Sequence, residues 1–233
     1  MTINKLLIIE DNTAEAIWAQ HDAIKAGIRD FFVATNLSDA LKYLPQVDAV
    51  VSDLFFPAGS TATDQYIQRF LPYYESFKED TFTKIGKDDP IYLVMEEASS
   101  LLGITPQRYV EEIMASRNLC ELIMDSARSA VYGIRKYSKY LEFQKIEENI
   151  RSGRNLPLGI IVAEQAKERD LASVIVTSTH HHSDQFAPVK GLISSVPYFD
   201  TSVEGRKNWK AGIDTLLRME SESKIGRIIK ECK

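Results

Sequence analysis

The stretch VVSDLFFP, at residues 50–57, decides the fold of this chain. Its apolar run ends at Asp53, and Pro57 follows four positions later. A short apolar run that is bounded in this way is typical of a buried strand. Open α/β sheets bind their ligands at the carboxyl ends of their strands. Asp53 is therefore expected at the edge of a sheet where a site can form.

Two further stretches have the same form. Residues 5–12 (KLLIIEDN) are an apolar run that closes on Glu10 and Asp11, and residues 172–179 (ASVIVTST) are one that closes on Thr177. Parallel neighbouring strands have their carboxyl ends at the same edge of a sheet. If the three strands are such neighbours, these side chains converge with Asp53 on one site.

The pattern resembles the receiver domain of two-component response regulators. That family has an acidic pair after its first strand and a phosphoaccepting aspartate, with a proline four positions later, after its third. A threonine or serine follows the fourth strand. Glu10, Asp11, Asp53, Pro57 and Thr177 match these features in the correct order. The resemblance implies a flavodoxin-like, doubly wound α/β fold with a parallel five-stranded sheet in the order 2-1-3-4-5.

The resemblance also implies the chemistry of the site. Asp53 would accept a phosphoryl group, and Thr177 would donate a hydrogen bond to it. Mg²⁺ would be held by Glu10, Asp11, the Asp53 side chain and the carbonyl oxygen of Phe55. The partner upstream would be a histidine kinase or a phosphotransfer protein. The output would be contact with an unknown protein, because no output domain is legible in the sequence.

The fifth strand departs from the family, which has a Lys-Pro after it. The best candidate is residues 191–198 (GLISSVPY), where Val196 occupies the place of the lysine and Ile193 that of the usual aromatic residue. Lys190, Lys207 or a lysine from the insert could substitute for it. The alternative interpretation is a pseudo-receiver that is not phosphorylated and acts as a protein-binding module. A metal-dependent hydrolase is less favoured, because no nucleophile–base pair is legible.

Residues 58–155 separate the Asp53 strand from the segment that best matches the next receiver helix, which begins near residue 156. The interpretation is an α/β domain at 1–57 and 156–221, an inserted helical subdomain at 58–155 and a basic tail at 222–233. Helical spacing recurs in the insert from Tyr66, from Ile91, after Pro106 and from Leu119. Asn12 or Thr13 is expected to cap the first helix, with Glu15 three residues after Asn12 in capping-box spacing. The apolar stripe of Ile17, His21 and Ile24 in this helix is expected to face the sheet.

Composition limits the other function classes. The chain has 233 residues and a net charge of -5, which argues against a general nucleic-acid binder. Its two cysteines, Cys120 and Cys232, indicate no disulfide framework, and no apolar run is long enough for a signal peptide or a membrane helix. A soluble, cytoplasmic protein is expected. His180, His181 and His182 follow the Thr177 strand, as a solvated loop or as a contact for a metal or phosphate.

Overall fold

A computed structural model describes residues 3–59, 63–82, 96, 99–100, 103–105, 108, 128–180, 183–193, 195–200, 202–203 and 205–231. The chain folds as two compact units. The first comprises Met1–Tyr73 and Asn149–Lys233, and the second comprises Tyr74–Glu148. The second unit lies entirely within the predicted insert, whereas both ends of that insert belong to the first unit.

The first unit contains the predicted parallel sheet. Its strands are β1 (Lys5–Ile9), β2 (Asp30–Ala34), β3 (Ala49–Ser52), β4 (Ala172–Val176) and β5 (Tyr198–Phe199), in the order β2-β1-β3-β4-β5. Every pairing in this sheet is parallel. The prediction of a flavodoxin-like α/β fold with an insertion after the third strand is confirmed. A separate antiparallel ribbon joins β6 (Ser202–Val203) to β7 (Arg206–Lys207).

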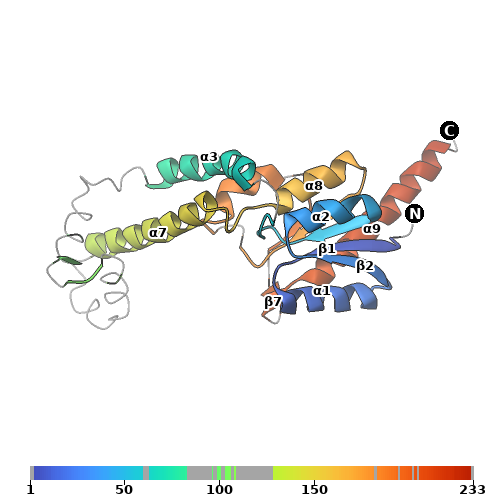
Figure 1. The fold of residues 1–233 in the computed structure, drawn as a ribbon, viewed down its shortest axis with the longest axis horizontal. Coiled ribbons are helices and arrows are strands. Elements are labelled where there is room, and N and C mark those ends of the chain that lie inside the picture. The colour runs from blue at the N-terminus through green and yellow to red at the C-terminus, as the bar shows by residue number, and fades with distance from the viewer. Residues whose placement is uncertain are drawn as a thin grey trace. The chain divides into compact units, whose positions relative to one another are not determined.

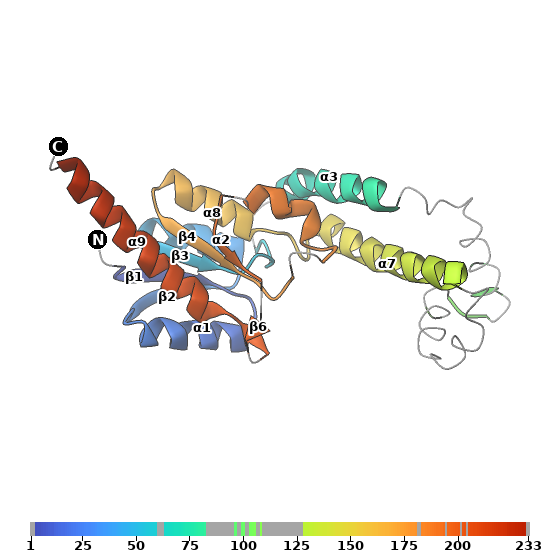
Figure 2. The same ribbon diagram turned by 180° about the vertical axis from the view of Figure 1, so that it is seen from behind.

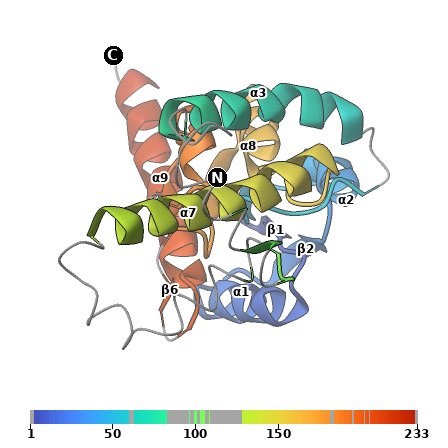
Figure 3. The same ribbon diagram turned by 90° about the vertical axis from the view of Figure 1, so that its left-hand side faces the viewer.

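Helices cover both faces of the sheet. They are α1 (Thr13–Lys25), α2 (Leu37–Tyr43), α8 (Gly159–Glu168) and α9 (Trp209–Glu231), with the short 3₁₀ helices η1 (Leu44–Gln46) and η2 (Ala187–Ile193). Helices α1 and α9 pack together on one face, and α2 and α8 cover the other (Figures 1 and 2). The end-on view places α1 on one side of β1 and β2 and α2 on the other (Figure 3).

The central strands are apolar because both of their faces are covered. Leu6 and Ile8 of β1 and Val51 of β3 pack against Trp209 and Ile213 of α9. The register pairs Ile9 with Ser52 and Ser52 with Ile175, so the carboxyl ends of the three strands are aligned. The residues that follow these strands therefore emerge side by side.

The stripe predicted to face the sheet in α1 points the other way, which corrects the sequence interpretation. Ile17 is 58% exposed, Ile24 is 54% exposed and His21 is also exposed. The residues that α1 buries are Ala16, Ala19, Asp22 and Ala23. Small side chains let the helix lie close to the sheet and to α9, so the alanine face is the one that packs. The large apolar side chains are left on the outer face.

The fifth strand also differs from the prediction. It is Tyr198–Phe199, and Tyr198 pairs with Ile175 of β4. Val196 therefore precedes the strand at its amino end, where its N–H donates to the carbonyl of Ile193 at 2.9 Å. The assignment of Val196 to the lysine position is wrong, because this residue is at the opposite edge of the sheet from Asp53.

The described part of the second unit is largely helical. It includes the end of α3 (Thr63–Phe82) and most of α7 (Arg128–Arg151). Tyr74 and Phe143 are buried between these helices, and Lys78 forms an ion pair with Glu147 at 2.7 Å. The helix expected from Tyr66 is confirmed. The helices expected from Ile91 and Leu119 begin outside the described residues, as does the one expected after Pro106.

The predicted basic tail begins within α9, which runs without interruption to Glu231. None of the helices in the described part of the chain has the length and apolar character that crossing a bilayer requires.

Candidate functional site

Three acidic side chains meet at the carboxyl edge of the sheet. The N–H of Asp53 donates to the carbonyl of Ile9 at 2.8 Å, which fixes the start of its loop against β1. Glu10, Asp11 and Asp53 each offer a carboxylate oxygen, and these oxygens lie within 4.8 Å of one another. Glu10 and Asp53 are buried, whereas Asp11 is exposed. The predicted convergence of the acids is confirmed.

This cluster could hold a metal ion. Its donors are carboxylate oxygens, which hard cations such as Mg²⁺ and Ca²⁺ prefer. Mg²⁺ is usually bound through one or two carboxylates together with water and phosphate oxygens, and the exposed Asp11 leaves one side of the cluster open to solvent. The residues present therefore fit such a cation.

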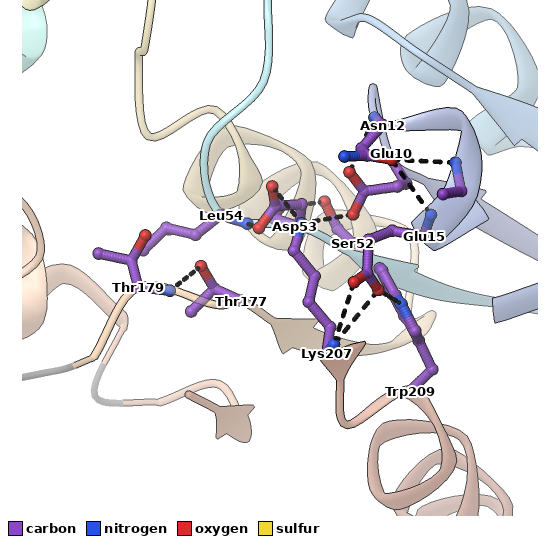
Figure 4. Close-up of polar contacts among 11 residues, drawn as sticks. Glu10, Asn12, Glu15, Ser52, Asp53, Leu54, Thr177, Thr179, Lys207 and Trp209 are labelled. Carbon is purple, nitrogen blue, oxygen red and sulfur yellow. Dashed lines mark hydrogen bonds and ion pairs between the residues drawn. The ribbon is translucent and has the colours of Figure 1, made fainter. Parts of the chain in front are cut away.

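A lysine already bridges the two buried acids. The Nζ of Lys207 lies 2.8 Å from Oδ2 of Asp53 and 2.5 Å from Oε2 of Glu10. Lys207 is itself buried, and Figure 4 shows its side chain extending from β7 towards both carboxylates. One ammonium group thus compensates part of the charge of two acids.

Sequence reasoning named Lys207 only as one of several possible substitutes. The residue comes after β5, as the family pattern requires, but eight positions beyond Phe199 and on the separate ribbon of β6 and β7. The residue spacing of the family pattern does not predict a lysine on such a ribbon. The one signal in the sequence is its position two residues before Trp209, where the closing helix begins.

Burial dominates the electrostatics of the cluster. It raises the pKa of Glu10 to about 7, with a further contribution from the negative charge of Asp53, although Lys207 acts in the opposite direction. Burial likewise raises the pKa of Asp53 against the opposing effect of Lys207. Burial alone would lower the pKa of Lys207, but the two carboxylates outweigh it and raise that pKa. The site therefore favours the charged lysine and disfavours two charged acids.

The loop of Asp53 is fixed by several short contacts. Oδ1 of Asp53 accepts the N–H of Leu54 at 2.7 Å, and the carbonyl oxygen of Asp53 accepts the hydroxyl of Ser52 at 2.6 Å. The N–H of Gly159, the first residue of α8, donates to the carbonyl of Leu54 at 3.0 Å. A Cβ atom on Gly159 would lie 2.4 Å from the carbonyl oxygen of Asp53, so only glycine allows this approach.

Thr177 and Phe55 complete the predicted set. Thr177 follows β4 at the same edge as the acids and is buried, and its Oγ1 accepts the N–H of Thr179 at 3.2 Å (Figure 4). Phe55 is buried in the loop after Asp53. The metal-ligand role of its carbonyl oxygen stays a prediction. His180 is exposed, and His181 and His182 lie outside the described residues.

Glu15 is a residue of this edge that sequence reasoning assigned elsewhere. Its spacing from Asn12 suggested a capping box, in which its carboxylate would return to the backbone N–H of the cap residue. That N–H instead donates to Oε1 of Glu10 at 2.9 Å. Asn12 does cap α1, because its Oδ1 accepts the N–H of Ala14 at 2.9 Å. The carboxylate of Glu15 turns towards β7 and α9.

Comparisons with protein-family models, with curated proteins and with solved structures give no match for this chain. The parallel five-stranded sheet and its helices are compatible with a receiver-like fold.

Proposed function

We propose that this chain is a receiver-like signal-transduction protein in which Asp53 accepts a phosphoryl group. The observation that carries the proposal is the contact between Lys207 and Asp53 at 2.8 Å. An aspartate, an acidic pair and a lysine are thereby gathered at the carboxyl edge of a sheet with the 2-1-3-4-5 order. The lysine comes from a different position than the family pattern predicts, but it supplies the same positive charge.

The chemistry assigned to Asp53 is nucleophilic. One carboxylate oxygen attacks phosphorus and forms a P–O bond, while the bond from phosphorus to the donor's leaving group breaks and the leaving group takes the electron pair. Glu10, Asp11 and Asp53, with the Phe55 carbonyl, would hold Mg²⁺, which neutralises phosphoryl charge when it is bound.

Two residues would stabilise the transferred group. The ammonium of Lys207 already contacts Oδ2 of Asp53, so a small rotation of its side chain would bring it to a phosphoryl oxygen bound there. Thr177 Oγ1 accepts a hydrogen bond from Thr179, which leaves its own hydroxyl hydrogen free to donate to the phosphoryl group. Preorganised donors of this kind lower the cost of developing negative charge.

The partners proposed are proteins. A histidine kinase or a phosphotransfer protein would supply the phosphoryl group, and the response would pass on through protein contact. The net charge of -5 makes nucleic acid an unfavourable partner for the chain as a whole.

One observation favours a second candidate, a pseudo-receiver that binds partners without being phosphorylated. The ammonium of Lys207 lies 2.5 Å from Oε2 of Glu10 as well as next to Asp53. It therefore already compensates carboxylate charge at the position where a cation would bind. A site of this kind could be maintained for the stability of the fold alone.

Intact-mass measurement separates the two candidates. The protein is incubated with acetyl phosphate and Mg²⁺, and with acetyl phosphate and a chelator. A phosphoryl adduct that requires Mg²⁺ and is absent in Asp53→Asn supports phosphorylation at Asp53. The matched control is Asp30→Asn, because Asp30 is an exposed acid whose ion pair is with Lys5. An adduct that persists in Asp53→Asn assigns the chemistry to another residue, and no adduct at all favours the pseudo-receiver.

A further inference from the structure

Glu15 makes three hydrogen bonds to a part of the chain that is remote in sequence. Its carboxylate accepts the backbone N–H of Lys207, at 3.3 Å to Oε1 and 3.2 Å to Oε2. Oε2 also accepts the indole N–H of Trp209 at 2.8 Å. One side chain in the first turn of α1 thus holds the backbone at Lys207 and the ring two residues later (Figure 4).

The backbone at Lys207 requires these contacts because its own strand, β7, is too short to fix it. Strand β7 has two residues and pairs only with the two residues of β6, outside the main sheet. An isolated two-stranded ribbon is marginal even when it is longer. The family pattern places a proline directly after the lysine, whereas Asn208 follows Lys207 here. The pairing of Lys207 with Ser202 in this short ribbon is therefore a weak restraint on its backbone, and no proline adds to it.

Glu15, in the first turn of α1, supplies a further restraint on the backbone at Lys207. The capping interaction that its spacing predicts is taken over by Glu10, which accepts the N–H of Asn12. The carboxylate of Glu15 is thereby released to accept from β7 and α9. The same two acidic residues therefore contact Lys207 at both ends, Glu15 at the backbone N–H and Glu10 at the ammonium group.

We propose that Glu15 is a positioning residue, which fixes Lys207 so that its ammonium group reaches Asp53 and the phosphoryl group bound there. The inference rests on the proposed function, because it assigns Glu15 a role in phosphorylation at Asp53. Among the interactions described, Glu15 contacts neither the phosphoryl acceptor Asp53 nor the acidic pair of Glu10 and Asp11. Glu15 acts only through Lys207 and Trp209.

A double-mutant cycle tests this role through the rate of adduct formation with acetyl phosphate and Mg²⁺. Glu15→Ala is expected to lower the rate about 10-fold, as the loss of an outer-shell partner commonly does. In the Lys207→Ala background, Glu15→Ala is expected to cause no further loss, because the residue through which it acts is gone. Glu15→Gln keeps an acceptor oxygen and should recover part of the rate. Equal losses in both backgrounds would overturn the inference.

A second readout does not depend on phosphorylation. The ¹³Cε signal of Lys207, assigned by its loss in Lys207→Ala, reports where the lysine side chain lies. Glu15→Ala should shift it, and Glu168→Ala, which alters an exposed helical glutamate, should not. If the wild type forms no adduct, the proposed function fails, and a shift in Glu15→Ala still supports the positioning of Lys207. An unchanged signal in Glu15→Ala and Glu15→Gln contradicts that positioning whatever the adduct shows.

Discussion

The Nζ of Lys207 lies 2.8 Å from Oδ2 of Asp53, and this contact joins the loop after β3 to a ribbon outside the main sheet. Both side chains are buried. A buried ion pair contributes little by itself, since desolvation offsets most of the attraction, but removal of one partner leaves the other charge buried without compensation. The lysine therefore matters for the fold before any ligand arrives.

Lys207→Ala should reduce the free energy of unfolding by about 3 kcal/mol at neutral pH without metal, because two buried carboxylates then lose their shared ammonium group. Urea denaturation measures this loss. Lys190→Ala is the control, because Lys190 is exposed in η2. Millimolar Mg²⁺ should restore part of the stability of Lys207→Ala. A loss no larger than that of the control would show that Lys207 is not the counter-charge of the acids.

The sequence was sufficient for the sheet and its acids because both depend on local patterns. Apolar runs that close on Glu10 and Asp53 gave the strand ends, and the known order of the fold placed those ends at one edge. Lys207 could not be placed in this way. Its position depends on a two-residue ribbon and on contacts with Glu15. The periodicity of apolar residues in the sequence predicts neither of these.

Helix α1 shows a second limit. Its sequence has an apolar stripe at Ile17 and Ile24 and a stripe of small residues at Ala16, Ala19 and Ala23. Hydrophobicity alone favours burial of the isoleucines. The structure buries the alanines, because the helix lies close to its neighbours. Which stripe faces inward depends on the distance between helix and sheet, which the sequence does not state.

Gly159→Ala should destabilise the protein by about 2 kcal/mol, because the new Cβ would overlap the carbonyl oxygen of Asp53 at 2.4 Å. In an open helical position the same change usually stabilises by about 0.5–1 kcal/mol. Thermal or urea unfolding shows whether Gly159→Ala lowers or raises the free energy of unfolding. Gly191→Ala is the matched control, since a Cβ there meets nothing within 4 Å. A stabilised Gly159→Ala would contradict the close approach of α8 to the Asp53 loop.

The stability of the metal-free protein should fall as the pH rises from about 5 to 7. The folded state keeps a proton on Glu10, whose pKa is raised to about 7 by burial, whereas the unfolded chain releases that proton near its ordinary value of 4.5. The folded state thus binds more protons in this window, and its advantage of up to about 3 kcal/mol is lost as Glu10 ionises. Denaturation at a series of pH values measures the slope.

Glu10→Gln provides the reference for this pH dependence, because it cannot ionise. The difference in unfolding free energy between wild type and Glu10→Gln should change across the window, while the contributions of groups remote from the acidic cluster cancel. Millimolar Mg²⁺ should reduce the slope of the wild type, since a cation favours ionised carboxylates. Parallel curves for the two proteins would show that Glu10 titrates at its ordinary pKa.

The two ends of the insert, residues 58–73 and 149–155, belong to the first unit. Ser38 of α2 donates its N–H to the carbonyl of Ala58 at 3.2 Å, which holds the chain where it leaves the Asp53 loop. Arg69 of α3 forms an ion pair with Glu164 of α8. Helix α8 in turn begins at Gly159, whose N–H donates to the loop after Asp53. Direct contacts therefore connect that loop, through α8, to Arg69 in the first half of α3.

We expect occupancy of the site to slow hydrogen exchange in residues 63–73 and 149–153. Coupling requires that these segments differ in free energy between the empty and the occupied site, and ordering of the Asp53 loop would provide that difference. Exchange is measured by mass spectrometry with and without Mg²⁺ and beryllofluoride, and Asp53→Asn serves as the control that lacks the acceptor. Arg69→Ala should weaken the effect, because it removes the contact between α3 and α8. Unchanged exchange across residues 58–155, with beryllofluoride demonstrably bound, would mean that the insert is not coupled to the site and that its contribution to signalling is independent of Asp53.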